Sequence, residues 1–435
     1  MIRYGARIIQ SLRANPLRAL TRYSLLLLVG VVLASAALNL WAWHHVREAD
    51  RLVDRQHFSK AYTHFTQALW VWRRSAATHF LAARTARRAG LYTEAERHLD
   101  ECQRLQGDVS GYSLPLALEH LLVQAQSGDI GEVEEVLWGY VNKNKPETPL
   151  ILEAMARGYV RVLRLGSALL CVRMLLEREP DNIEALLTRA WIRESGGEPE
   201  KSSEDYRRAL ELNPERDDAL LGLAKSLVRD QPAEARTYFE QVITRQPDNL
   251  DALLGLAQAE RIAGEPDKAR AALDQLLARD PKNSKALMER GALTLAAGKA
   301  SEAETLLREA IAADPGNAEA HYQLYLCLEQ QPGREEEAAA QRDTHKRVQG
   351  DLARLLQIAS SEMTRAPNDP NLHQEMGVLY LRYGKPDVGV RWLYRALKLS
   401  PAHQASHQAL YEYFRRTGQL EKAELHRMQL HASTK

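Results

Sequence analysis

Prolines recur at a nearly constant interval in the second half of the chain. Five of them follow one another at this interval, and two more keep the same spacing: Pro180, Pro214, Pro247, Pro281 and Pro315, then Pro367 and Pro401. Proline ends a helix because it lacks an N–H donor and its ring clashes with the preceding turn. A helix stop with this period indicates a repeated structural unit of about 34 residues and not one large globular core.

Other residue types keep the same period. Small residues form one column and bulky residues another: Ala190, Ala224, Ala257 and Gly291, then Tyr206, Phe239, Leu273 and Leu307. Gly264 and Gly298 lie midway between the prolines, where glycine favours the left-handed conformation that ends a helix. Each unit is therefore predicted to be two antiparallel helices. One such pair cannot bury its apolar faces alone, so the pairs must stack.

These columns resemble the tetratricopeptide repeat. The clearest unit covers residues 250–281, and its matching positions are Leu253, Leu256, Ala257, Gly264, Ala269, Leu273, Leu276 and Pro281. The resemblance extends over nearly all of the chain after residue 44. It implies an all-α fold, a right-handed α-solenoid of helix pairs, and a function in binding other proteins.

The repeats vary in quality along the chain. Residues 44–148 are expected to form degenerate repeats, since the pattern of Ala61, Phe65 and Ala68 returns one period later but no stop proline follows. Residues 149–331 contain the regular repeats. Residues 332–366 exceed the period and are expected to add helices that interrupt the array before the C-terminal repeats of residues 367–435.

An uncharged apolar segment from Ser24 to Trp43 precedes the repeats. It has about the length that a helix needs to cross a bilayer. Tyr23 at one end, and Trp41 and Trp43 at the other, are typical of the aromatic belts at membrane surfaces. The sequence therefore predicts one transmembrane helix over residues 23–43.

Residues 1–22 form a basic tail with no acidic residue, and its arginines are Arg3, Arg7, Arg13, Arg18 and Arg22. The positive-inside rule places this tail in the cytoplasm and the repeats on the other side of the membrane. Single-pass repeat proteins of this kind are frequent in bacterial cell membranes, an analogy at the level of the family. The tail is also compatible with a segment that lies on an anionic leaflet.

A second interpretation of the N-terminus stays open. Ala34, Ser35 and Ala36 fit the small-residue cleavage site of a secretory signal, which would release a soluble exported repeat protein. The long basic tail and the continuation of the apolar run to Trp43 favour an uncleaved anchor.

In the tetratricopeptide family, the first helix of each pair lines the concave binding face. The residues that align with this face are Leu187, Trp191, Leu221, Lys225, Leu254, Gln258, Met288, Leu295, Tyr322 and Leu326. Most of them are apolar, unlike the basic columns with which chaperone-binding members clamp a terminal carboxylate. We expect a groove for a protein or peptide partner such as an amphipathic helix, with Trp191 and Tyr322 as anchors.

No chemistry-bearing pattern stands out. Cys102, Cys171 and Cys327 are far apart, and His403 with His407 lacks a third ligand, so neither a metal site nor a cofactor is predicted. The net charge of +1 gives no field for nucleic acid. The sequence thus predicts a non-catalytic, membrane-anchored scaffold. An accessory subunit of an envelope enzyme or assembly machine is a further alternative.

Overall fold

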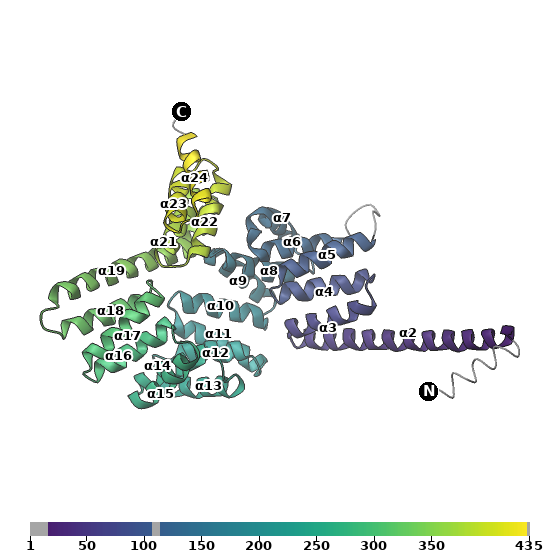
Figure 1. The fold of residues 1–435 in the computed structure, drawn as a ribbon, viewed down its shortest axis with the longest axis horizontal. Helices are drawn as coiled ribbons and strands as arrows, with labels where there is room; N and C mark the ends of the chain where they lie inside the picture. The colour runs from purple at the N-terminus through teal and green to yellow at the C-terminus, as the bar shows by residue number, and fades with distance from the viewer. Residues whose placement is uncertain (1–15, 107–113, 433–435) are drawn as a thin grey trace. The chain divides into compact units, whose positions relative to one another are not determined.

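The computed structural model describes residues 16–106 and 114–432, and every element in these ranges is helical (Figure 1). The helices form successive antiparallel pairs, as the sequence predicts. The chain divides into two compact units that meet at Trp138 and Gly139, and each is described separately.

The first unit begins with an unusually long helix. Its elements are α2 (Pro16–Asp54), α3 (Phe58–Val71), α4 (Ala76–Arg88), α5 (Tyr92–Gln106), α6 (Leu114–Gln124), the π-helical turn η1 (Ala125–Asp129) and α7 (Ile130–Asn142), which crosses into the second unit. Helix α2 combines the apolar segment and the first helix of the first pair without a break. A boundary between residues 43 and 44 therefore does not correspond to an end of secondary structure.

The second unit holds the regular repeats. Its elements are α8 (Thr148–Arg161), α9 (Leu165–Arg178), α10 (Ile183–Ser195), α11 (Pro199–Leu212), α12 (Asp217–Leu227), α13 (Pro232–Arg245), α14 (Leu250–Ile262), α15 (Pro266–Arg279), α16 (Ser284–Ala296), α17 (Ala300–Ala313), α18 (Ala318–Glu329), α19 (Glu335–Gln357), η2 (Ile358–Glu362), α20 (Met363–Arg365), α21 (Pro370–Arg382), α22 (Pro386–Leu399), α23 (Gln404–Arg416) and α24 (Leu420–Ala432).

The apolar part of α2 is uncovered in this structure. Leucine and valine side chains between Leu25 and Leu40 are exposed, and from Ser24 onward the first buried residue is Ala42, where packing against α3 begins. Among the described residues, α2 is the one helix long and apolar enough to cross a membrane.

Most stop prolines are followed two residues later by an asparagine or aspartate that caps the next helix, whereas Arg216 and His403, after Pro214 and Pro401, make no side-chain cap hydrogen bond. Pro247 ends one unit, and two residues later the Asn249 side chain accepts a hydrogen bond of 3.0 Å from the backbone N–H of Ala252. An asparagine at this position satisfies one of the free N–H groups at a helix start. The midway turns use glycine as predicted, with φ of +82° at Gly264 and +78° at Gly298.

Bulky residues of one pair pack against glycines of the next. A Cβ atom added at Gly222 on α12 would lie 2.3 Å from Tyr206 Cζ on α11, and one at Gly255 on α14 would lie 2.1 Å from Phe239 Cζ on α13. Such distances leave no room for a side chain, so glycine is required for the close stacking of these pairs.

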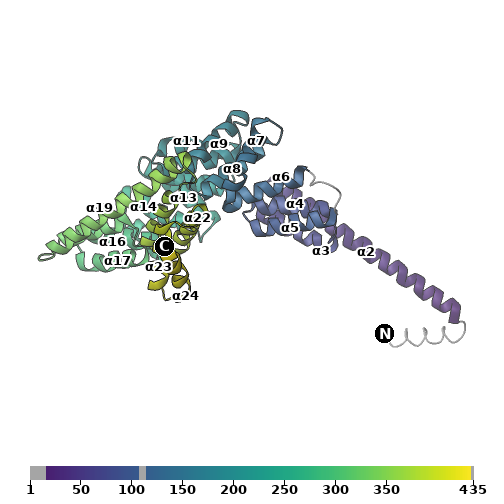
Figure 2. The same ribbon diagram turned by 90° about the horizontal axis from the view of Figure 1, so that it is seen from above.

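Helix α19 accounts for the extra residues between Pro315 and Pro367. It runs from α18 back toward α9, and the segment that follows it packs there (Figures 1 and 2). Leu163 contacts the apolar cluster around Ile358 and Met363, and a Cβ at Gly166 would lie 2.7 Å from Thr364 Oγ1. The segment that was expected to interrupt the array therefore also contacts α9, and so joins the end of the regular repeats to their beginning.

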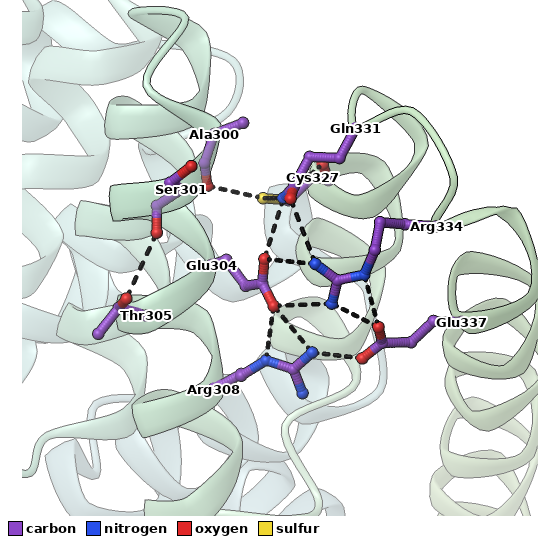
Figure 3. A network of polar contacts seen from close by, with 9 residues as sticks. All are labelled: Ala300, Ser301, Glu304, Thr305, Arg308, Cys327, Gln331, Arg334 and Glu337. Carbon is purple, nitrogen blue, oxygen red and sulfur yellow. Dashed lines mark hydrogen bonds and ion pairs between the residues drawn. The ribbon is translucent and has the colours of Figure 1, made fainter.

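A network of charges fixes the start of α19 against α17 (Figure 3). Arg334 donates to Glu304 over 3.0 Å and also pairs with Glu337, while Arg308 bridges the same two carboxylates. The hydrogen bond from Arg334, together with those from Gln331 and Arg308, lowers the pKa of Glu304 to about 2. These charge-assisted bonds hold the turn before α19 in one position.

The last helix, α24, is polar at the positions where α22 packs against α23, although Leu420, Leu425 and Met428 are exposed elsewhere on it. On α22, the apolar residues that pack with α23 are Val390, Leu393 and Leu397, and one period later the equivalent positions on α24 are Glu424, Arg427 and His431. Helix α24 therefore offers charged groups where another repeat would need apolar ones, as expected of a terminal unit.

Candidate partner-binding groove

The first helices of the regular pairs line one wall. Helix α10 contacts α12, α12 contacts α14, α14 contacts α16 and α16 contacts α18, whereas contacts between successive second helices are fewer. Because the first helices approach each other more closely, they form the inner side of the curved array.

Four of the predicted groove residues surround one open pocket of about 480 Å³. Leu187 and Trp191 come from α10, and Leu221 and Lys225 come from α12. Trp191 is 41% exposed, so packing against the next helix pair does not bury it. The spacing of four residues places each couple on one helix face, which is why both couples point to the same space.

A carboxyl group and a phenol lie at the back of this pocket. Tyr206 on α11 donates its hydroxyl hydrogen to Glu194 Oε2 over 3.1 Å, and both residues line the pocket. Burial raises the pKa of Glu194, although the Tyr206 hydroxyl and Lys225 act in the opposite direction. Burial and Glu194 together raise the pKa of Tyr206. The back of the pocket therefore offers a partly desolvated hydrogen-bond acceptor.

Two ion pairs border the same pocket. Lys225 Nζ lies 2.7 Å from Asp251 Oδ2 on α14. Asp218 accepts two hydrogen bonds from Arg216, over 2.9 and 2.7 Å. Burial opposes ionisation of Asp218, but the bonds from Arg216 and from the backbone hold its pKa below the ordinary value. The rim thus carries both signs of charge around an apolar and aromatic centre.

The remaining predicted residues do not join this pocket. Met288 and Leu295 are buried in the core between α16 and α18, and Leu326 packs against the edge of that core. Leu254 packs against the core between α14 and α16. Tyr322 is partly exposed but contacts His345 on α19, with 5.3 Å between ring centroids.

Farther along the wall, side chains of α14 and α16 form hydrogen bonds with one another. Gln258 on α14 donates to Glu289 on α16 over 2.8 Å, and Arg261 donates to the same carboxylate over 2.9 Å. These side chains satisfy one another. The pocket between α10 and α12 is therefore the part of the predicted surface where an exposed aromatic anchor, Trp191, borders a pocket together with other predicted groove residues.

The sequence pattern did not identify Glu194, Tyr206 or Asp218 as pocket residues. Tyr206 was assigned to the bulky packing column, and the two acidic residues resemble solvated helix ends. Glu194 could have been found from its spacing in the sequence, because it lies three residues after Trp191 and therefore on the same helix face.

Histidine pairs are a second feature that the sequence analysis missed. His407 does not act with His403; its Nδ1 lies 2.9 Å from His426 Nδ1 on α24. His79 and His98 form the same contact between α4 and α5 in the first unit. No group of three or more metal-ligating side chains occurs in residues 16–106 and 114–432.

Hydrogen-bond geometry fixes the tautomers in these pairs. His79 Nε2 faces the carbonyl oxygen of Arg73 at 3.2 Å, so it carries the hydrogen and its Nδ1 accepts one from His98 Nδ1. The Tyr62 hydroxyl then donates to His98 Nε2 over 3.3 Å. Every ring nitrogen in the pair has a partner while both histidines are neutral, which explains the pairs as packing elements.

Comparison with known families agrees with this architecture. Models of the tetratricopeptide repeat match residues 183–216, 227–290 and 288–343. The chain is a tetratricopeptide-repeat protein. Tetratricopeptide repeats typically serve as interaction modules, and their stacked pairs create extended binding surfaces. No curated protein matches the sequence.

Several solved structures of tetratricopeptide-repeat proteins are similar to the chain. A tetratricopeptide repeat protein of Parabacteroides merdae is 19% identical over 66% of this chain and 98% of its own length, with a TM-score of 0.43. PilW, described as a type IV pilus biogenesis factor, is 20% identical over 51% of this chain and 99% of its own, with a TM-score of 0.38. MamA is 20% identical over 39% and 93%, with a TM-score of 0.34.

Proposed function

We propose that this tetratricopeptide-repeat protein is a non-catalytic scaffold, anchored to a membrane by one helix, that holds a partner protein in its groove. The single observation that carries the binding part is the pocket between α10 and α12, with Trp191 exposed at its mouth. Large aromatic side chains in such positions contribute much of the binding energy of protein interfaces, because they bury a large area with few rotatable bonds.

The pocket suits a segment that presents an apolar side chain beside a hydrogen-bond donor. Leu187, Leu221 and Trp191 would contact the apolar part, and the carboxyl group of Glu194 would accept the hydrogen bond. An amphipathic helix of a partner protein has this chemistry along one face. The mixed charges of Lys225 and Asp218 at the rim would orient it.

The anchor is proposed on the character of α2. Its apolar window has a mean hydropathy of 2.3 and only 6% of it is buried, so lipid would cover side chains that the protein leaves open. With Arg residues before this segment, the N-terminus would lie in the cytoplasm and the repeats on the opposite side. Measurement of the mature N-terminal mass separates this arrangement from release by signal cleavage after Ala36.

Site-specific photo-crosslinking in membranes tests the groove. A benzophenone amino acid at position 191 of the full chain should yield one discrete adduct, and the same label at Leu425, an exposed position on α24, should not. Substitution of Leu221 by Asp places a charge in the apolar part of the pocket and should abolish the adduct. The proposal fails if position 191 gives no adduct, or if the Leu221→Asp variant keeps it while circular dichroism shows an intact fold.

A further inference from the structure

The α3–α4 turn, which comprises the C-terminal end of α3 and the loop to α4 (residues 70–75), carries the most exposed large apolar side chain of the described residues. Trp70, at the end of α3, is 78% exposed, and Arg73 and Arg74 in the loop are exposed as well. An indole in full contact with water is costly on a free surface. A surface that accepts aromatic and basic groups together would remove this cost.

The turn is fixed beside the apolar part of α2. Trp72 donates its indole N–H to Asn39 Oδ1 over 2.8 Å, and Asn39 donates to the carbonyl oxygen of Ser35 over 2.8 Å. Asn39 belongs to the uncharged segment and precedes Trp43 by one helical turn. The hydrogen bond thus ties the start of the second repeat pair to a residue of the proposed membrane helix.

The hydrogen bond between Trp72 and Asn39 sets the level of the α3–α4 turn along the proposed membrane helix α2. A helix rises 1.5 Å per residue, so Asn39 lies roughly 6 Å deeper than Trp43 along α2. Trp41 and Trp43 are both partly exposed and mark the level of the lipid headgroups if α2 crosses the bilayer. A turn bonded to Asn39 must then lie at or just below that level.

The side chains of the turn match this depth. Tryptophan is enriched at membrane interfaces because its ring is apolar and its N–H is polar. Arginine binds lipid phosphates with a planar set of donors. At the same level of α2, the guanidinium of Arg47 lies 4.3 Å from the ring centre of Trp43. Aromatic and basic groups from two elements therefore share one layer.

We propose that the α3–α4 turn is a second membrane contact, in which Trp70 enters the headgroup region and Arg73 and Arg74 bind anionic lipid phosphates. This inference rests on the proposed anchoring by α2. A single helix would let the repeats tilt and rotate over the membrane. Two contacts that are rigidly joined by the Trp72–Asn39 bond and by α2–α3 packing fix the orientation of the first repeat pairs at the surface.

Fluorescent labels at three positions of the full chain test the inference. Each is attached to a single cysteine, introduced as Trp70→Cys, Ser59→Cys or Val32→Cys, in a background with Cys102, Cys171 and Cys327 replaced by alanine. Ser59 is the matched control, since it is exposed on the same helix α3 but roughly 17 Å from position 70 at 1.5 Å per residue. The protein is reconstituted in phosphatidylcholine vesicles with or without phosphatidylglycerol.

An environment-sensitive nitrobenzoxadiazole label should report three environments. At position 70 it should emit at shorter wavelength than at position 59 and be quenched by headgroup nitroxides. At position 32 it should be quenched by nitroxides deep in the acyl chains. Replacement of Arg73 and Arg74 by glutamine should weaken the quenching at position 70 in vesicles that contain phosphatidylglycerol.

The outcomes separate the two claims. If position 32 is in hydrocarbon while position 70 reports water as position 59 does, the second contact is wrong and the anchor stands. If position 32 reports water in vesicles, the anchor itself is wrong. If position 70 leaves water only when another protein is added, the turn is a protein-binding surface and the proposed lipid contact is overturned.

Discussion

Acidification should loosen the first unit of the protein through the His79–His98 pair. His98 is buried between α4 and α5, and its pKa is lowered to about 4, first by burial and then by the neighbouring His79 and Arg97. Glu94 and Glu101 act in the opposite direction but do not restore the ordinary value of 6.5. The folded state therefore favours the neutral imidazole more strongly than the unfolded chain does.

The sign and size of the effect follow from linkage. Between pH 6.5 and about 4, the unfolded chain binds a proton at His98 that the folded state refuses, so stability falls as the pH falls through this window. The difference between these two pKa values, at about 1.4 kcal/mol per pKa unit, corresponds to at most roughly 3.5 kcal/mol at the acidic end.

A non-titrating variant of the pair has a precedent in the same chain. At the equivalent site in the pair α18–α19, a glutamine takes the place of the second histidine: His321 Nδ1 lies 3.0 Å from Gln341 Oε1, and His321 Nε2 lies 3.1 Å from the carbonyl oxygen of Pro315. A glutamine amide carries both a C=O acceptor and an N–H donor, so rotation of the amide at position 98 can turn its N–H toward His79 Nδ1. His98→Gln should therefore keep the hydrogen bond to His79 while removing the titration of position 98.

Hydrogen exchange with mass spectrometry on the full chain in detergent micelles measures the effect locally. The opening free energy of α4 and α5 peptides should fall on acidification by up to about 3.5 kcal/mol in the native protein, and by clearly less in His98→Gln. Peptides from α14 and α15, which lack a histidine, provide the internal reference for the intrinsic pH dependence of exchange. Equal losses in both proteins, or none in the native protein, would refute the reasoning.

Two further predictions concern packing. Glu119→Gln should cost about 3–5 kcal/mol, because it leaves the buried guanidinium of Arg87, 2.5 Å away, without its counter-charge. The double replacement Arg87→Met with Glu119→Leu should recover most of this loss, and a double variant as unstable as the single one would contradict the explanation. Gly222→Ala should destabilise by about 1–3 kcal/mol through its clash with Tyr206, whereas Gly350→Ala, with open space around it, should stabilise by about 0.5–1 kcal/mol. Urea unfolding followed by circular dichroism measures all four variants, and equal shifts for both glycines would refute the clash.

The periodic features of the fold could be predicted from the sequence. Stop prolines and glycine turns act within a few residues, so they leave the same local mark in most of the regular units. The pocket residues Trp191 and Leu221 were likewise predictable, since the first helix of a pair has a fixed face toward the inner wall. Whether that pocket binds a partner stays a prediction.

Contacts between distant elements left weaker signals. The segment after α19 packs against α9 and brings Thr364 close to Gly166. The sequence separation of these two residues does not follow from the repeat period. The histidine pairs did have a signal, because His79 and His98 each lie one repeat period after another histidine, His45 and His64 respectively. Histidines that recur at the repeat period on two packed helices indicate a repeated contact between those helices. A search for metal ligands on a single helix does not reveal this contact.

The polar bonds between α14 and α16 limit how a partner can use the groove. Glu289 is buried and already accepts hydrogen bonds from Gln258 and Arg261. A partner segment lying across this part of the wall would have to replace charge-assisted bonds that are satisfied within the protein, and breaking them would leave a buried carboxylate unpaired. At the α10–α12 pocket, by contrast, binding would cover an indole that water now contacts. The free energy of association should therefore be concentrated on a short anchor segment at Trp191, and lengthening that segment toward α16 should add little affinity.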